Sequence, residues 1–127
     1  MPIQLPDFDY DTTTLSIKAD GVDMVIVIHS GFTQEAIQAS QYFTMCCNAA
    51  KEQDVALENE VDNFGVKIKE QTETYKSFVA QYAQKLVIDW PVDGDCFDTL
   101  LANQSLAWSI IRKSDEKAKE FFEKKNK

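Results

Sequence analysis

The chain has 127 residues, the size of one typical domain, and is 44% hydrophobic and 11% aromatic. This composition supports one hydrophobic core and excludes wholesale disorder. Its 21 acidic residues against 13 basic ones give a formal net charge of -8, which argues against general nucleic-acid binding because phosphate contacts need a dense basic surface.

The chain begins with a stretch that is predicted to be an extended arm. Residues 1–13 contain Pro2 and Pro6 and a string in which aspartates alternate with Phe8 and Tyr10. Such arms bury little apolar surface of their own and often dock on another surface.

A β-hairpin is predicted next. Apolar and polar residues alternate over residues 15–19, and Asp20-Gly21 supplies the pair favoured in a type I′ turn. The two-residue loop pairs Ala19 with Val22, Lys18 with Asp23, Ile17 with Met24, and Leu15 with Ile26. The apolar partners then share one face, and the one charged pair has opposite signs.

The second strand of this hairpin is apolar on both faces over residues 25–28. That pattern is typical of a strand covered on both sides. Val25 and Val27 would therefore be covered either by a helix of the same chain or by a neighbouring subunit.

A helix is predicted after Ser30-Gly31, with Thr33 as its N-cap and Glu35 in its first turn. Its apolar residues recur at helical spacing: Ala36, Ile37, Ala39, Phe43, Cys46, Cys47 and Ala50. Cys46 and Cys47 are expected on or beside the buried stripe. The acidic segment over residues 51–62 either extends this helix or forms a mobile loop that ends at Gly65.

The second half of the chain predicts helices around one short strand. The first helix contains Tyr75, Phe78, Val79, Tyr82 and Leu86, with Lys69 and Glu73 on its other side. A strand over residues 86–90 follows, and Pro91 stops it. A turn with Asp93 and Asp95 leads to a helix containing Phe97, Leu100 and Leu101, and then to one over residues 106–111.

Ser114, followed by Asp115 and Glu116, is predicted to cap a last helix. Residues 112–127 are expected to form a mobile basic tail. Together the elements predict an α+β fold in which an N-terminal β-hairpin and a short third strand accompany a helix-dominated remainder. A single domain over residues 1–127 accounts for all of them.

Charge is distributed unevenly along the chain. Residues 1–64 carry 11 acidic groups and two lysines, whereas residues 65–127 carry 10 acidic and 11 basic groups. An acidic front and a basic end suit head-to-tail self-association. They equally suit a solvated acidic face that keeps the protein in solution by repulsion.

No signal peptide or membrane-spanning segment is expected. The first eleven residues contain no lysine or arginine, and the longest apolar run, residues 24–28, is far shorter than the roughly 20 residues of a spanning helix.

The chain has three cysteines, Cys46, Cys47 and Cys96. Because their number is odd and two of them are adjacent, they favour a reducing compartment. Cytoplasmic residence follows as the expectation.

Residues suited to catalysis are scarce. The chain has one histidine, His29, one arginine and four glycines, and it has no glycine-rich phosphate loop. Its cysteines and His29, which sits at the end of an apolar strand, lack zinc-ligand spacing, and the cysteines are interpreted as core residues. Asp93 and Asp95 are interpreted as turn residues. The expectation is a binding or chaperone protein with no enzyme activity, no cofactor and no metal.

The C-terminal third resembles the tail assembly chaperones of long-tailed, lambda-like bacteriophages. The resemblance lies in the order of a strand at residues 87–90, a Gly/Asp turn, the F-x-x-L-L pattern at residues 97–101, an apolar helix at residues 106–111, and Phe121-Phe122 before lysines. The length, the acidity and the early hairpin are similar too.

The resemblance implies a function in the infected cell. Such proteins coat the long helical tape-measure protein, keep it soluble, help tube subunits polymerise around it, and are then displaced, so they are not expected in the mature virion. Many are made in two lengths by a programmed minus-one ribosomal frameshift, and the longer form recruits the tail tube protein. This chain would be the short form. Lys124-Lys125-Asn126 can be encoded by AAA AAA AAC, which contains a slippery heptamer of the A AAA AAC kind.

Candidate residues for contact with the tape-measure protein or another subunit follow from this function. They are aromatic residues near the ends and apolar residues of the second strand and the F-x-x-L-L helix: Phe8, Tyr10, Val25, Val27, Phe97, Phe121 and Phe122. Leu100, Leu101 and Ile110 are interpreted as core. An alternative function is a small acidic inhibitor or DNA mimic that binds a basic protein, and a metabolic enzyme is a distant third.

Overall fold

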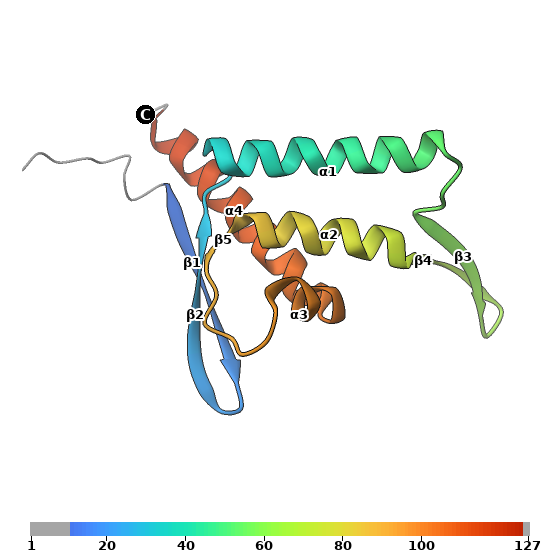
Figure 1. Cartoon of the computed structure of the whole chain (residues 1–127), viewed down its shortest axis with the longest axis horizontal. Coiled ribbons are helices and arrows are strands. Elements are labelled where there is room, and N and C mark those ends of the chain that lie inside the picture. Colours follow the sequence, from blue (N-terminus) through green and yellow to red (C-terminus); the bar gives the residue numbers. More distant parts are fainter. Residues whose placement is uncertain (1–10, 126–127) are drawn as a thin grey trace, which may run out of the picture.

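The computed structural model describes residues 11–125 of the chain. In chain order the elements are β1 (Thr12–Ala19), β2 (Val22–His29), α1 (Gln34–Glu52), β3 (Glu58–Asn63), β4 (Val66–Gln71), α2 (Glu73–Leu86), β5 (Val87–Asp89), α3 (Cys96–Ala102) and α4 (Gln104–Lys125) (Figure 1). The predicted α+β class is confirmed, with a β1–β2 hairpin, a short third strand and a mainly helical remainder.

The predicted register of the β1–β2 hairpin is confirmed pair by pair, from Ala19 opposite Val22 to Leu15 opposite Ile26. Asp20 and Gly21 have φ angles of 51° and 77°, both in the left-handed region that a type I′ turn requires. β5 adds antiparallel to β2, so the sheet order is β1-β2-β5.

The core lies between one face of this sheet and the helices. Ile26 and Ile28 on β2 are 0% exposed and pack with buried residues of α2, α3 and α4. These are Val79, Ala80, Ala83 and Leu86 of α2, Leu100 of α3, and Ala107, Ile110 and Ile111 of α4. Ala36 and Ala39 of α1 belong to the same cluster. The interpretation of Leu100 and Ile110 as core residues is therefore confirmed.

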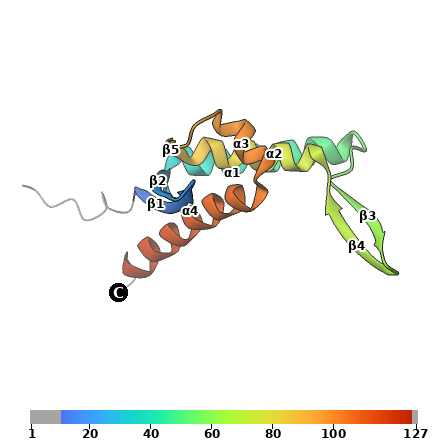
Figure 2. The same cartoon turned by 90° about the horizontal axis from the view of Figure 1, so that it is seen from below.

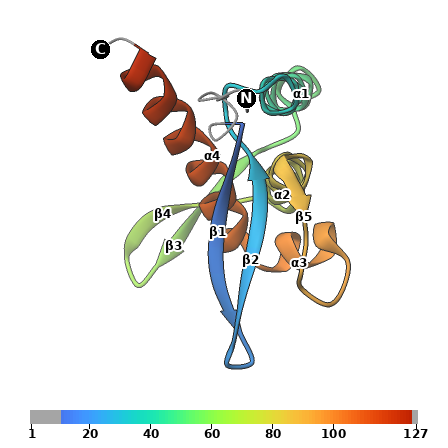
Figure 3. The ribbon, with the colours of Figure 1, turned by 90° about the vertical axis from the view of Figure 1, so that its left-hand side faces the viewer.

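The other face of the sheet, called here the outer sheet face, is not covered by a described element. Figure 3 shows β1 and β2 in front of α4, with their outer face toward the viewer. Val25 is 45% exposed and Val27 is half-buried. Within residues 11–125 no helix covers this second face, because the helices pack on the face that carries Ile26 and Ile28. Cover by a helix of the same chain is therefore wrong for the described residues, and cover by a neighbouring subunit stays a prediction.

A second hairpin, β3–β4, replaces the helix extension or loop predicted for the acidic segment. Its register places Val61 opposite Ile68, Glu60 opposite Lys69, and Asp62 opposite Lys67. Lys69 is thus a strand residue, and its predicted place on the second helix was wrong. The hairpin projects from the ends of α1 and α2, away from the rest of the fold (Figure 2).

The C-terminal part of the described chain is a single helix. α4 continues through Ser114, whose predicted role as an N-cap was wrong. Its buried hydroxyl donates to the His29 carbonyl oxygen at 2.8 Å, and its own carbonyl accepts from the Gly31 amide at 2.9 Å. A Cβ on Gly31 would lie 3.1 Å from that carbonyl oxygen, so glycine permits the close approach of the β2–α1 loop to α4.

Two predicted terminal segments are corrected by these boundaries. The mobile basic tail at residues 112–127 is helix α4 as far as Lys125, with Phe121 buried against the fold. The arm predicted at residues 1–13 ends earlier, because Thr12 and Thr13 belong to β1. Its residues 1–10, including Phe8 and Tyr10, lie outside the described chain.

Candidate partner-binding surfaces

Within residues 11–125 the fold does not bring the predicted contact residues together. Val25 and Val27 lie on the outer sheet face, whereas Phe97 of α3 is half-buried against the core. Phe8 and Tyr10 lie outside the described residues. The remaining two, Phe121 and Phe122, lie on the last turns of α4.

Phe121 and Phe122 have different environments although they are adjacent. Phe121 is 7% exposed and stacks on Phe32, with ring centroids 4.1 Å apart and an interplanar angle of 6°. Phe122 is 53% exposed and presents its edge toward Phe32 at 6.3 Å. The ring of Phe121 is therefore used within the chain, and the exposed ring of this pair is that of Phe122.

The middle of the β1–β2 pair is uncharged on the outer sheet face, and Asp89 of β5 lies opposite Val27 across the neighbouring strand pair. Val25 pairs with Ser16 and Val27 pairs with Thr14, and the side chains of each pair lie on this face. Ile88 of β5, 48% exposed, extends the apolar surface. Sequence reasoning identified the two valines but missed Ile88, because the short strand predicted over residues 86–90 does not show which of its faces the helices cover.

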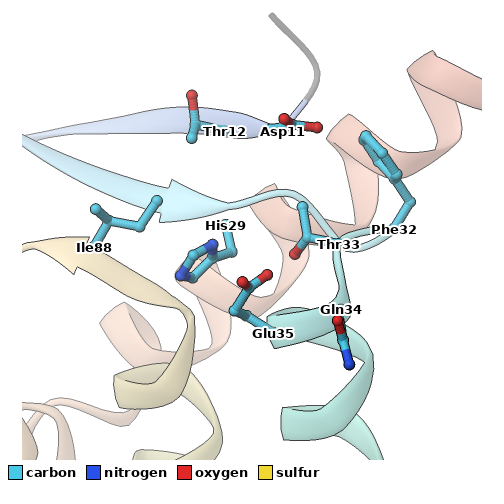
Figure 4. A pocket seen from close by; sticks show the side chains of 8 residues that line it. All are labelled: Asp11, Thr12, His29, Phe32, Thr33, Gln34, Glu35 and Ile88. Atoms are coloured by element: carbon cyan, nitrogen blue, oxygen red, sulfur yellow. The ribbon is translucent and has the colours of Figure 1, made fainter. Parts of the chain in front are cut away.

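A pocket of about 520 Å³ lies at one end of this face, between the start of β1, the end of β2 and the start of α1. Figure 4 shows the His29 ring between the Ile88 side chain and the Glu35 carboxylate, and all three residues line the pocket. The pocket offers one imidazole and acidic groups from Asp11 and Glu35. Within residues 11–125 no group of three or more possible metal ligands occurs.

A third surface is the solvent side of α1. Thr33 caps this helix as predicted, its hydroxyl accepting from the Ala36 amide at 3.2 Å. No charged residue occurs over residues 36–50, although 27% of the whole chain is charged. The exposed residues that define this α1 neutral face are Ile37, Gln38, Gln41, Tyr42, Met45 and Asn48.

The α1 neutral face is well placed for contact. α1 packs against α2 and leaves its other side to solvent (Figure 1). Met45, near the middle of this side, is 65% exposed, and Ile37 is 45% exposed. At the border the Lys85 ammonium lies 4.7 Å from the Tyr42 ring centroid, so cationic charge lies at the rim. The cores of protein interfaces differ from the rest of the surface in having few charged residues, and the centre of this face has that composition.

The β3–β4 hairpin carries a fourth surface, called here the hairpin apolar face. Val61, Val66 and Ile68 share one side of the ribbon, and Phe64 lies in the turn at its tip. Phe64 is 101% exposed and Val66 is 61% exposed. The opposite side is charged, with the Lys67 ammonium 3.4 Å from a Glu60 carboxylate oxygen.

Cys96 is expected to be the slow-reacting thiol of the folded chain. Burial, with a smaller contribution from the Asp95 carboxylate, raises the pKa of the Cys96 thiol from 9.0 to about 11. A raised pKa leaves less thiolate at pH 8, so iodoacetamide should alkylate Cys96 at least about tenfold more slowly in the folded chain than in urea. The difference should shrink as the pH approaches 11. Equal rates by mass spectrometry at pH 8 would contradict this environment.

Comparisons with known proteins assign no function to the chain, so a function has to be argued from these surfaces. No protein-family model, curated protein sequence or solved structure matches the chain. In the described part of the chain, no helix combines the length and apolar character needed to cross a membrane.

Proposed function

We propose that the chain is a tail assembly chaperone of a long-tailed bacteriophage. It would bind the tape-measure protein in the host cytoplasm and keep it soluble while the tail tube is assembled, and it would leave before the virion matures. The resemblance of the C-terminal third motivates the proposal, and the α1 neutral face is the observation that carries it. Recruitment of the tail tube protein would belong to a longer, frameshifted form.

The α1 neutral face has the chemistry for packing against another helix. A long amphipathic helix aggregates through its apolar stripe unless that stripe is covered. Met45 is flexible and polarisable, so it adapts to side chains that differ from one repeat to the next. The glutamines and Asn48 beside it hydrogen-bond without introducing a charge that would have to be desolvated. Such a surface suits reversible binding at many similar sites along one partner.

Weak contacts become sufficient when many copies bind one long chain. Each copy would contribute one helix-on-helix contact, and neighbouring copies would raise the effective concentration of the next. The net charge of -8 would keep the loaded complex dispersed through repulsion. Displacement by tube subunits stays possible because no single contact is tight.

The test is co-expression with the tape-measure protein. Met45→Glu places a charge at the centre of the α1 neutral face and should lower binding at least about tenfold, leaving the tape-measure protein insoluble. Ser105→Glu adds the same charge at an exposed position on α4 and is the matched control. Equal rescue of solubility by Met45→Glu and the unaltered chain would refute the use of this face.

The DNA-mimic alternative makes a different prediction in the same experiment. It requires acidic groups arrayed together on one exposed face, and binding to a basic protein that fails as salt rises. On the charged side of β3–β4 the acidic residues alternate across the strands with lysines, as Glu60 and Lys69 do. Salt-sensitive capture of a basic protein, with no effect on tape-measure solubility, would favour that alternative.

A further inference from the structure

The residue at the tip of β3–β4 is in a conformation that its type disfavours. Phe64 has a φ angle of 54°, in the left-handed region where a bulky side chain is a true outlier. Asp20, at the same loop position of the β1–β2 hairpin, has a φ angle of 51° and is a residue type that tolerates this conformation. Asparagine or aspartate would therefore form the β3–β4 turn with less strain than phenylalanine.

Packing among the described residues does not explain Phe64 either, because its side chain is wholly exposed. The turn itself is held by polar contacts, since the Gly65 amide donates to the Asp62 carboxylate at 2.9 Å. A large apolar ring in a strained and solvated position indicates a contact outside the described chain.

The ribbon behind Phe64 needs the same kind of contact. An isolated two-stranded hairpin is marginally stable in water, and a third strand or a packed face is needed to hold it. Every residue of β4 is exposed, including Val66 and Ile68. The apolar side of this ribbon has no cover within the described chain. It therefore needs a second layer of protein to pack against.

A surface that could pack against this ribbon is present on the same molecule. The outer sheet face presents Val25, Val27 and Ile88, flanked by Thr14 and Ser16, and is the second sheet surface without a cover among the described elements. The two surfaces lie at opposite ends of the long axis: Figure 1 shows β3–β4 at one end and the β1–β2 hairpin at the other. Figure 3 shows that the outer sheet face looks outward along that axis.

We propose that the hairpin apolar face of one copy packs on the outer sheet face of a second copy of this chain. Sheets pack face to face at about 10 Å through interdigitating side chains, and valines and isoleucines on both faces suit that geometry. The two surfaces differ, so the contact is head to tail. Each copy keeps one hairpin and one sheet face available, and copies add in an open row.

Charge also favours this arrangement over pairing of two hairpins. Residues 58–71 carry four acidic groups and two lysines, a net of -2. The last part of α4, residues 112–125, carries six basic and four acidic groups, a net of +2, and α4 packs beside β1. A hairpin docked on the neighbour's sheet would lie near the basic helix end, whereas two hairpins face to face would bring like charges together.

The experiment measures the mass of the purified chain alone by sedimentation and light scattering, from micromolar concentration to about 1 mM. The unaltered chain should associate as its concentration rises. Phe64→Asn, which relieves the turn, and Val25→Asp, which charges the receiving face, should each weaken association at least tenfold. Asp20→Asn, at the matching turn position, should associate as the unaltered chain does. Ser16→Asp gives a second variant of the receiving face if Val25→Asp fails to fold by circular dichroism.

Mixing the two variants decides the geometry. Val25→Asp retains an intact hairpin and Phe64→Asn retains an intact outer sheet face, so together they should form a one-to-one dimer that cannot extend. Pairing between two hairpins predicts that Val25→Asp, which keeps its hairpin, associates on its own. A mixture that stays monomeric would overturn the proposal. So would an unaltered chain that is monomeric at about 1 mM, or variants that associate normally. Because no tape-measure protein is present, these results are independent of the proposed function.

Discussion

The Ile110→Ala variant is expected to lose about 2–5 kcal/mol of unfolding free energy. Ile110 is 0% exposed and lies on α4 within the cluster that joins the sheet to α2 and α3. Alanine removes its apolar contacts and leaves a cavity that a helix packed on a sheet cannot close by a small movement. A loss of this size is a large part of the 5–15 kcal/mol that usually separates folded from unfolded chains.

Urea unfolding followed by circular dichroism measures this loss, and Ile37→Ala is the matched control. It makes the same chemical change on α1, but Ile37 is 45% exposed. Its cost should stay within about 1 kcal/mol, since little apolar area is uncovered and alanine is the better helix former. Equal losses in the two variants would show that Ile110 is not where the described packing places it.

The two hairpins show why the first could be predicted from the sequence and the second could not. In the first, strict alternation and Asp20-Gly21 specify both the strands and the turn, and the register follows from the loop length. In the second, Phe64 stands where a turn residue is expected, and charged residues fill the strands. The signal that was available is cross-strand: Glu60 and Asp62 face Lys69 and Lys67.

Ser114 illustrates a different limit of sequence reading. Serine before Asp115 and Glu116 has the pattern of a helix start, because these residue types satisfy free amides. In the fold the same hydroxyl satisfies the carbonyl of His29, 85 residues earlier in the chain. A hydroxyl can donate or accept a hydrogen bond, and its partner is whichever backbone group lies nearby. Which group that is depends on the tertiary structure.

The candidate surfaces were only partly predictable for the same reason. Apolar type and spacing identified Val25 and Val27, but which face the helices cover depends on their packing. Met45 lies opposite the buried stripe of α1, and its 65% exposure becomes meaningful only beside the uncharged run around it. That run was readable in the sequence as a stretch of 15 residues without charge, from 36 to 50.

The Phe121→Ala variant is expected to lose about 3 kcal/mol of unfolding free energy. Its ring is 7% exposed and stacks on Phe32, in the loop that also donates the Gly31 amide to the Ser114 carbonyl. Removing the ring takes away apolar burial and the aromatic contact that hold the end of α4 on the β2–α1 loop. The loss should appear both in urea unfolding and as faster amide hydrogen exchange over the last turns of α4.

Phe122→Ala provides the control because it removes the same ring one residue later, where 53% of the side chain is exposed. Its cost should be below about 1 kcal/mol, since a half-exposed ring has less apolar area to return to water. If Phe121 instead served mainly as a partner contact on a mobile tail, the two variants would unfold alike and differ only in binding. A clear difference in unfolding free energy would assign Phe121 to the fold and leave Phe122 as the aromatic residue of α4 available to a partner.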